Sequence, residues 1–290
     1  MTEKAIDLIL VQQQGWAKGK TKTLVSGKII DGEECKDKNY LETIEDNLFP
    51  INETKGLRHE NIKAYNKGGG SETKTITHRP KMSALHSSSA LVVNLFQYWQ
   101  NQEINKTPLL IALGLVNDND KVGDVKIKFE EKLQIEGING GTPNLDVIIE
   151  LGNEIIAIES KFAEPYRSKT YQGLGSKQYN DDSLWNDLPN IKEKRNITTK
   201  HLDYPQLIKH ILGLKNSKYK ENFTLLYLWY DVPNTKEAKK HEEEIEAFAT
   251  IAKADGIKFH HITYQKVIEN LNNYKNEHKD YIDYLVERYL

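Results

Sequence analysis

Two acids and one lysine are the residues of this sequence best suited to chemistry. Asp146 lies near the start of one apolar segment, and Glu159 and Lys161 lie near the end of the next. Opposed carboxylates repel each other unless a proton or a cation neutralises them, and a hard cation with oxygen ligands is the simplest choice. The two acids therefore predict a site for Mg²⁺ or Mn²⁺.

The two segments, residues 144–151 and 154–162, are predicted to form a β-hairpin. The pair Gly152-Asn153 between them suits the positive φ angles of a two-residue turn. Such a turn places Asp146 directly opposite Glu159, with Cβ atoms about 4.5–5.5 Å apart. Period-two alternation puts Lys161 on the same face, while Val147, Ile149, Ile156, Ile158 and Ser160 point the other way into the core. The alternative is a surface salt-bridge ladder.

The surrounding elements are predicted from hydrophobic period. Hydroxyls at Ser87–Ser89 offer N-caps for a helix up to Trp99, and residues 125–130 alternate as a half-buried strand with Glu130 on its polar face. Pro205 opens a further helix. A buried strand (223–230), a charged helix (236–254), a strand (257–262) and a helical tail to residue 290 follow. This order predicts an α/β fold with a mixed central β-sheet flanked by helices.

Residues 86–290 are predicted to form this domain, and residues 1–85 an N-terminal extension of unknown role with β-like runs at 6–11 and 23–30. The chain has 290 residues, 40 basic and 42 acidic, so it lacks the basic excess of a protein that coats nucleic acid. Cys35, the single cysteine, forms no intramolecular disulfide. Without a signal-like or membrane-spanning run, the protein is expected to be cytoplasmic and not bound to a membrane.

Two of these segments also carry a family resemblance. Pro143-Asn144-Leu145-Asp146 with Ile158-Glu159-Ser160-Lys161-Phe162 resembles the PD-(D/E)XK nuclease superfamily. Over residues 85–215, the sequence also resembles a bacterial group of predicted restriction-endonuclease-like proteins, through Leu85–Ala90, Asn94–Phe96, Phe129-Glu130 and Glu159–Pro165. One departure is that Pro143 precedes Asp146 by three residues and is not adjacent to it. The resemblance implies a restriction-endonuclease-like core.

The resemblance also implies roles for individual residues. Asp146, Glu159 and the Ser160 carbonyl would bind Mg²⁺ or Mn²⁺, and Lys161 would orient the attacking water or neutralise the oxyanion. Glu130 would be the additional acid that completes the metal site. Glu131 would take its place if a bulge shifts the register of the strand. Three further residues are candidates for supporting the site, although a solvated helix face or a salt bridge explains them almost as well: Glu164, Gln206 and His210.

The polar stretch after the hairpin mixes cations with tyrosines, a combination that grips phosphates and stacks on bases. The alternative is a flexible solvated loop. The candidate nucleic-acid-binding residues are Lys169, Lys177, Lys192, Lys194, Arg195 and Lys200, with Tyr166, Tyr171 and Tyr179 among them.

The favoured function is a metal-dependent DNA endonuclease in restriction or another defence system, with RNA as the alternative substrate. Cutting both strands of a duplex calls for two active sites, which favours a homodimer. A second hypothesis is a non-catalytic nucleic-acid-binding or assembly protein that keeps the nuclease fold. A third is an NTPase, because residues 15–21 imitate a phosphate-binding loop, although that loop is one residue short and no obvious helix follows it.

Overall fold

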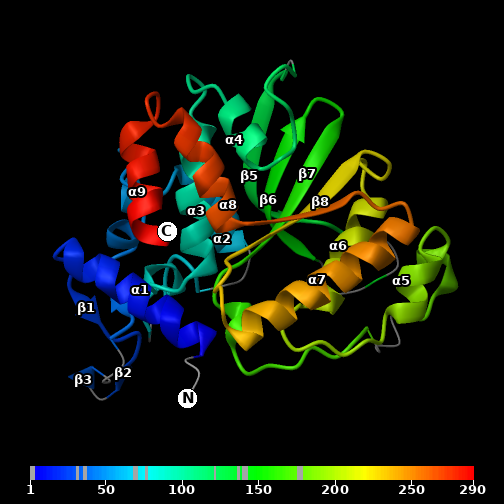
Figure 1. The fold of residues 1–290 in the computed structure, drawn as a ribbon, viewed down its shortest axis with the longest axis horizontal. Coiled ribbons are helices and arrows are strands. Elements are labelled where there is room, and N and C mark those ends of the chain that lie inside the picture. The colour runs from blue at the N-terminus through cyan, green and yellow to red at the C-terminus, as the bar shows by residue number, and fades with distance from the viewer. Residues whose placement is uncertain are drawn as a thin grey trace. The chain divides into compact units, whose positions relative to one another are not determined.

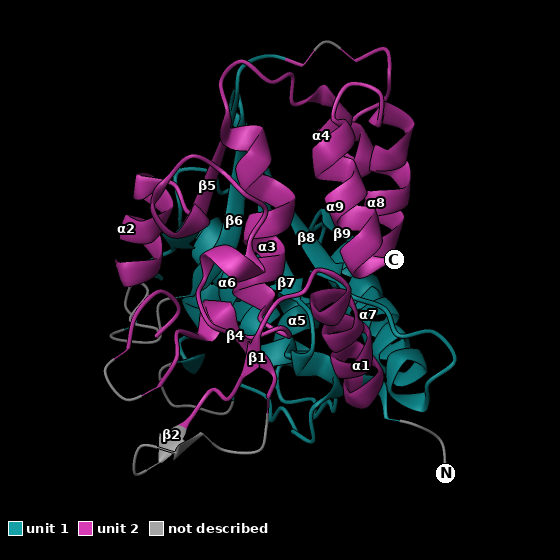
Figure 2. Cartoon of the chain, turned by 90° about the vertical axis from the view of Figure 1, so that its left-hand side faces the viewer, with its two compact units in different colours: residues 1–5, 123–126, 130–262 teal, residues 6–122, 127–129, 263–290 magenta. Residues whose placement is uncertain are grey.

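A computed structural model gives the structure of the chain. It describes residues 4–30, 33–34, 38–67, 71–75, 78–120, 122–135, 138, 143–174 and 179–290. Within these ranges, no helix is long and apolar enough to cross a lipid bilayer. By its internal contacts the chain divides into two units, which are coloured separately in Figure 2. Unit 1 comprises residues 1–5, 123–126 and 130–262, and unit 2 comprises residues 6–122, 127–129 and 263–290.

A five-stranded sheet in the order β5-β6-β7-β8-β9 forms the centre of the α/β fold (Figure 1). β6 and β7 are antiparallel, whereas β7 and β8 are parallel, so the sheet is mixed. This is the restriction-endonuclease-like architecture expected from the sequence. The strands are β5 (Val125–Lys132), β6 (Asn144–Leu151), β7 (Glu154–Lys161), β8 (Phe223–Trp229) and β9 (Phe259–Thr263).

The β6–β7 hairpin has the predicted register. Val147 pairs with Ile158, and the pairing continues to Leu151 opposite Glu154. Gly152 in the turn has φ +58°, a left-handed conformation that glycine adopts at no steric cost. One step beyond the Val147–Ile158 pair, the same register places Asp146 opposite Glu159.

Helices of unit 1 pack on the face of the sheet that carries Glu159. α6 (Tyr204–Lys215) and α7 (Lys236–Ala254) bury apolar side chains in one core with Ala157 and Tyr227 of the sheet (Figure 1). Gly213 allows close approach of α6, because a Cβ there would lie 2.8 Å from the Leu133 Cβ. The remaining helical elements of the unit are η5 (Glu164–Tyr166), η7 (Asp182–Trp185) and α5 (Pro189–Lys194).

Unit 2 is mainly helical. Its two-stranded pairs are β1 (Leu24–Val25) with β4 (Tyr40–Leu41) and β2 (Ile29–Ile30) with β3 (Glu33–Glu34). Its helices are α1 (Ala5–Gly19), α2 (His59–Lys67), α3 (Ser88–Phe96), α4 (Thr107–Ala112), α8 (Tyr264–Leu271) and α9 (Lys279–Tyr289). Short 3-10 turns are η1 (Glu45–Asn47), η2 (Thr54–Gly56), η3 (Lys81–Ser83), η4 (Gln97–Gln100) and η8 (Asn272–Tyr274).

The elements from residue 86 onward agree with the predicted order, with short helices added between them. Ser87 is the N-cap of α3 and accepts a hydrogen bond from the Ala90 amide at 3.2 Å. The prediction of a β-like run at residues 6–11 is wrong. These residues belong to α1, whose buried side chains follow a helical period: Ala5, Ile9, Gln13, Trp16 and Ala17.

The division into units also differs from the predicted boundary at residue 85. Unit 2 joins residues on both sides of that boundary with the C-terminal helices α8 and α9. The early residues therefore pack with parts of the chain that lie more than 200 positions away. The hydrophobic period of a segment does not show which distant segment packs against it.

Candidate active site

A buried ion pair lies at the end of the hairpin. Glu159 is 1% exposed, and the Lys161 ammonium contacts its Oε1 atom. Burial alone would raise the pKa of Glu159, but Lys161 and His210 outweigh it and lower the pKa to about 2. Burial alone would lower the pKa of Lys161, but Glu159, Asp146 and Glu164 raise it above its ordinary value. Glu159 is therefore ionised, and Lys161 is its counter-ion.

Asp146 belongs to the same electrostatic cluster. Burial and the charge of Glu159 raise the pKa of Asp146 well above its usual range, with Glu130 acting in the same direction and Lys161 against it. The Asp146 Oδ2 atom accepts a hydrogen bond from the Ser160 amide at 2.7 Å. The cluster thus holds three carboxylates and one lysine, an excess of negative charge that a divalent cation would neutralise.

Glu130, and not Glu131, is directed towards this cluster. Its backbone has φ +55°, unusual for a non-glycine residue, and the alternation of β5 breaks there, because Glu130 is half-buried while Glu131 and Lys132 are exposed. The carboxylate of Glu130 accepts a hydrogen bond from the Asn144 side chain. The strand is distorted, as the alternative prediction required, yet the distortion leaves Glu130 as the candidate.

α6 contributes two side chains to the cluster. The Lys161 Nζ atom lies 3.2 Å from Gln206 Oε1, and His210 Nε2 lies 2.8 Å from Glu159 Oε2. Glu164 interacts electrostatically with Lys161 and accepts a hydrogen bond from the Phe162 amide at 3.0 Å. The structure therefore places all three supporting candidates beside the ion pair. Their catalytic relevance stays a prediction.

The surface-ladder alternative is wrong. It requires the charged residues to lie on an exposed sheet face, whereas Glu159 is fully buried and the Lys161 side chain is 14% exposed. Both faces of the hairpin are buried at this point, since Val147, Ile149, Ile156 and Ile158 on the opposite face are buried as well. Glu159 therefore lies in a core where Coulomb interactions are stronger than at a surface, and Asp146 and Glu130 are half-buried.

The sequence analysis missed two residues beside the cluster. Asn144, whose side chain contacts Glu130, lies two residues before Asp146, so strand alternation could have placed it on the same face. Tyr227 pairs in register with Glu159 on β8, and its hydroxyl lies 2.9 Å from His241 Nε2 of α7. The sequence signal for Tyr227 was a phenol hydroxyl within a mostly apolar strand.

In the part of the polar stretch that the structure describes, the three tyrosines are core residues and not exposed stacking rings. Tyr166, Tyr171 and Tyr179 are buried, and the stretch contributes Trp185 and Ile191 to the core of unit 1. These tyrosines are therefore not available to stack on bases, because folding buries their faces.

The cations of the same stretch are dispersed. Lys192 pairs with Asp182 at 2.7 Å, Lys194 with Glu193 at 2.6 Å, and Arg195 packs over the Trp185 ring. Lys169 and Lys200 are exposed. Lys177 lies outside the described residues. A role for these residues in nucleic-acid binding stays a prediction.

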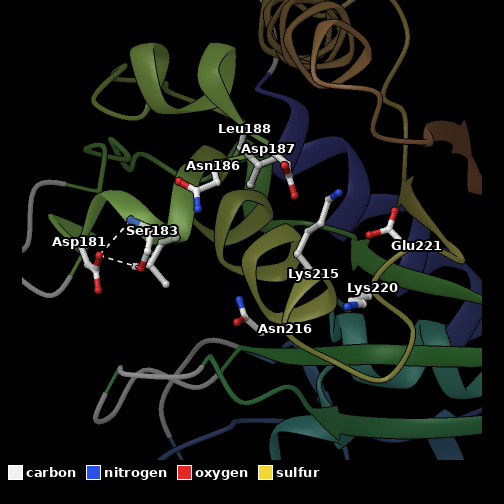
Figure 3. Close-up of a pocket in the computed structure, with 10 residues that line it drawn as sticks. Asp181, Ser183, Asn186, Asp187, Leu188, Lys215, Asn216, Lys220 and Glu221 are labelled. Carbon is white, nitrogen blue, oxygen red and sulfur yellow. Dashed lines mark hydrogen bonds between the residues drawn. The ribbon is translucent and has the colours of Figure 1, made fainter.

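Two cavities of unit 1 lie away from the acids. One, of about 440 Å³, is lined by polar side chains that include Asp187, Lys215 and Lys220 (Figure 3). The other, of about 510 Å³, lies between α7 and residues 197–204. Asp146, Glu159 and Lys161 line neither of them.

The number and type of the side chains in the cluster decide whether it could hold a metal. Among the described residues, no group of three or more histidine, cysteine, aspartate and glutamate side chains is arranged to hold an ion. This excludes a closed cage from that part of the chain. Mg²⁺ uses only one or two carboxylates and keeps several waters, so Asp146 and Glu159 fit Mg²⁺ or Mn²⁺ by their chemistry.

The phosphate-loop hypothesis does not fit the structure. Residues 15–19 form the C-terminal end of α1, whereas a phosphate cradle needs free amides at a helix N-terminus.

The fold and the acid cluster together define an α/β protein with a restriction-endonuclease-like core. A model of the family described as restriction endonuclease associating with ARP matches residues 12–290. The chain belongs to this family. The match includes most of the first 85 residues, to which the resemblance seen in the sequence did not extend. A search of the curated proteins finds no similar chain, and neither does a search of the solved structures.

Proposed function

We propose that the protein is a PD-(D/E)XK-type nuclease that hydrolyses DNA phosphodiesters with Mg²⁺ or Mn²⁺ bound between Asp146 and Glu159. The observation that carries the proposal is a group of carboxylates around one lysine, on a hairpin of a restriction-endonuclease-associated family. Lys161 interacts with Glu159, Asp146 and Glu164, and Glu130 acts on Asp146. A structural ion pair needs one acid for one base. A divalent cation, or protonation of Asp146, would neutralise the excess acids, and an excess of acid with a shifted pKa is typical of functional sites.

In this proposal each residue has a distinct task. Asp146, Glu159 and the Ser160 carbonyl hold the cation, and Glu130 adds negative charge beside Asp146. When bound, the cation would lower the pKa of the attacking water and stabilise the charge on phosphorus. Lys161 orients that water or neutralises the oxyanion, which its raised pKa supports by keeping it protonated.

The family description supports a role in restriction or defence and also supports association with a partner, the ARP of that description. DNA is the favoured substrate on the same ground. A homodimer is proposed because cleavage of both duplex strands calls for two active sites.

The test is incubation of the purified protein with duplex DNA, single-stranded DNA and RNA in Mg²⁺, Mn²⁺ or EDTA. Cleavage is expected with metal, none with EDTA, and none with Asp146→Ala. Activity of Glu130→Ala should fall well below that of Glu131→Ala, which is the matched control because Glu131 is the exposed neighbour. Cleavage unaffected by Asp146→Ala would place the activity elsewhere. Substrate binding without cleavage under all these conditions would favour a non-catalytic binding protein.

A further inference from the structure

His210 contacts one of the proposed metal ligands from a neighbouring helix. The side chain is fully buried in α6, with its Nε2 atom 2.8 Å from Glu159 Oε2. An ionised carboxylate only accepts hydrogen bonds, so Nε2 is the donor. The burial of Leu207 and Leu214, about one helical turn on either side, holds this part of α6 in place. The contact therefore fixes the direction in which the carboxylate points.

In each of the two acids, one carboxylate oxygen accepts a hydrogen bond from a group other than Lys161. Oδ2 of Asp146 accepts the Ser160 amide, and Oε2 of Glu159 accepts His210 Nε2. The other oxygen of Glu159, Oε1, contacts the Lys161 ammonium. Lys161 also has Gln206 Oε1 at 3.2 Å, so α6 offers the lysine a second acceptor.

We propose that His210 is a positioning residue that reserves Oε2 of Glu159, so that this carboxylate binds the divalent cation through Oε1 alone. The proposal rests on the proposed function. If the cation occupied Oε1, Lys161 would keep its hydrogen bond to Gln206. The lysine would then stay beside the phosphate that reacts. One helix thereby sets both the denticity of the ligand and the position of the lysine.

The experiment is a calorimetric titration with Mn²⁺ in the absence of substrate, on wild type, His210→Gln and His210→Asn. The glutamine amide nitrogen reaches about where Nε2 lies, whereas the asparagine amide nitrogen reaches about where Nδ1 lies. Both variants replace a buried ring with a smaller amide, and only His210→Gln keeps the donor. His210→Gln should bind Mn²⁺ nearly as well as wild type, and His210→Asn about 10- to 100-fold more weakly.

The outcomes separate this inference from the proposed function. Absence of Mn²⁺ binding by wild type, or unchanged binding by Asp146→Ala, overturns the proposed metal site and this inference with it. Binding by His210→Asn equal to that of wild type overturns the inference alone. If melting curves show that the variants do not fold, wild-type crystals soaked in Mn²⁺ decide. One Glu159 oxygen should lie roughly 2.0–2.2 Å from the ion, and two at that distance would overturn the proposal.

Discussion

Two buried charges, one in each unit, are stabilised in opposite ways. In unit 1, Glu159 and Lys161 form an ion pair beside two further acids. In unit 2, Arg288 is 1% exposed, and the acceptors that it reaches among the described residues are neutral. Its donors reach Gln13 Oε1 at 3.0 Å, the Asn47 carbonyl at 2.6 Å and the Tyr284 hydroxyl at 2.6 Å, and it stacks 4.0 Å from the Trp16 ring centroid.

The difference separates a structural charge from a functional one. Within the described residues, four hydrogen bonds join the guanidinium of Arg288 to oxygens of α1, α9 and η1, as expected where a charge links elements of the fold. The acids of unit 1 outnumber Lys161, so their mutual repulsion opposes folding until a proton or a further cation neutralises it. Removing a charge should therefore weaken unit 2, whereas at the acids of unit 1 it should relieve repulsion.

The largest expected effect is that of Arg288→Met. The substitution removes the donors of several buried acceptors, so the free energy of unfolding should fall by about 3 kcal/mol or more. Urea unfolding measures this. Lys20→Met is the matched control, because Lys20 pairs with Glu287 at the surface, and it should cost about 0–1 kcal/mol. If both substitutions lowered the free energy of unfolding equally, the buried Arg288 would contribute no more to stability than a surface lysine.

Lys161→Ala should lower the cleavage rate by roughly 10²-fold or more while substrate affinity is kept. Its charge is needed as the phosphorus is attacked, which makes the contact one of the transition state. The substitution also leaves Glu159 without its buried counter-ion, so the melting temperature in EDTA should fall. Cleavage rate, substrate affinity and melting temperature are compared with those of Lys253→Ala, an exposed lysine of α7. Unchanged cleavage in an active nuclease would contradict the role of Lys161.

Helix α6 contributes Gln206 and His210 to the site. Alanine substitutions of two glycines, one in α6 and one in α1, test how tightly α6 packs. Gly213→Ala adds a Cβ 2.8 Å from the Leu133 Cβ, which should cost about 1–3 kcal/mol and outweigh a helix-propensity gain of about 1 kcal/mol. Gly15→Ala in α1 meets nothing within 4 Å and should stabilise the protein by up to about 1 kcal/mol. The measurement is urea unfolding, in which the two variants should shift in opposite directions. Stabilisation by both would show that α6 tolerates the added atom.

The smallest effect is expected from Asp146→Asn in metal-free protein. Because the fold raises the pKa of Asp146, its ionisation costs folding energy at pH values above that raised pKa. The cost vanishes below the unfolded pKa, where both states are protonated. Asparagine should therefore stabilise the protein by about 1 kcal/mol at pH 8, and the gain should disappear towards pH 4. Melting curves in EDTA at both pH values measure it, and a loss of stability at pH 8 would contradict the excess of charge.

The sequence by itself determined the hairpin and its register. Two residues of turn, Gly152 and Asn153, fix which residues of the two strands oppose each other, and strand period fixes the faces. Both are local properties, so the juxtaposition of Asp146, Glu159 and Lys161 could be predicted without other parts of the chain. The helical spacing of Gln206 and His210 was equally local, although the partners of these residues were not.

Only the tertiary structure decided what surrounds the hairpin. His210 reaches Glu159 across 51 positions of sequence, and this packing turns a set of charged residues into a buried ion pair. The same packing places Tyr166, Tyr171 and Tyr179 in the core, and Arg288 reaches Asn47 across 241 positions. Burial depends on contacts between distant segments, and hydrophobic period within one segment carries no information about which distant segment will cover it.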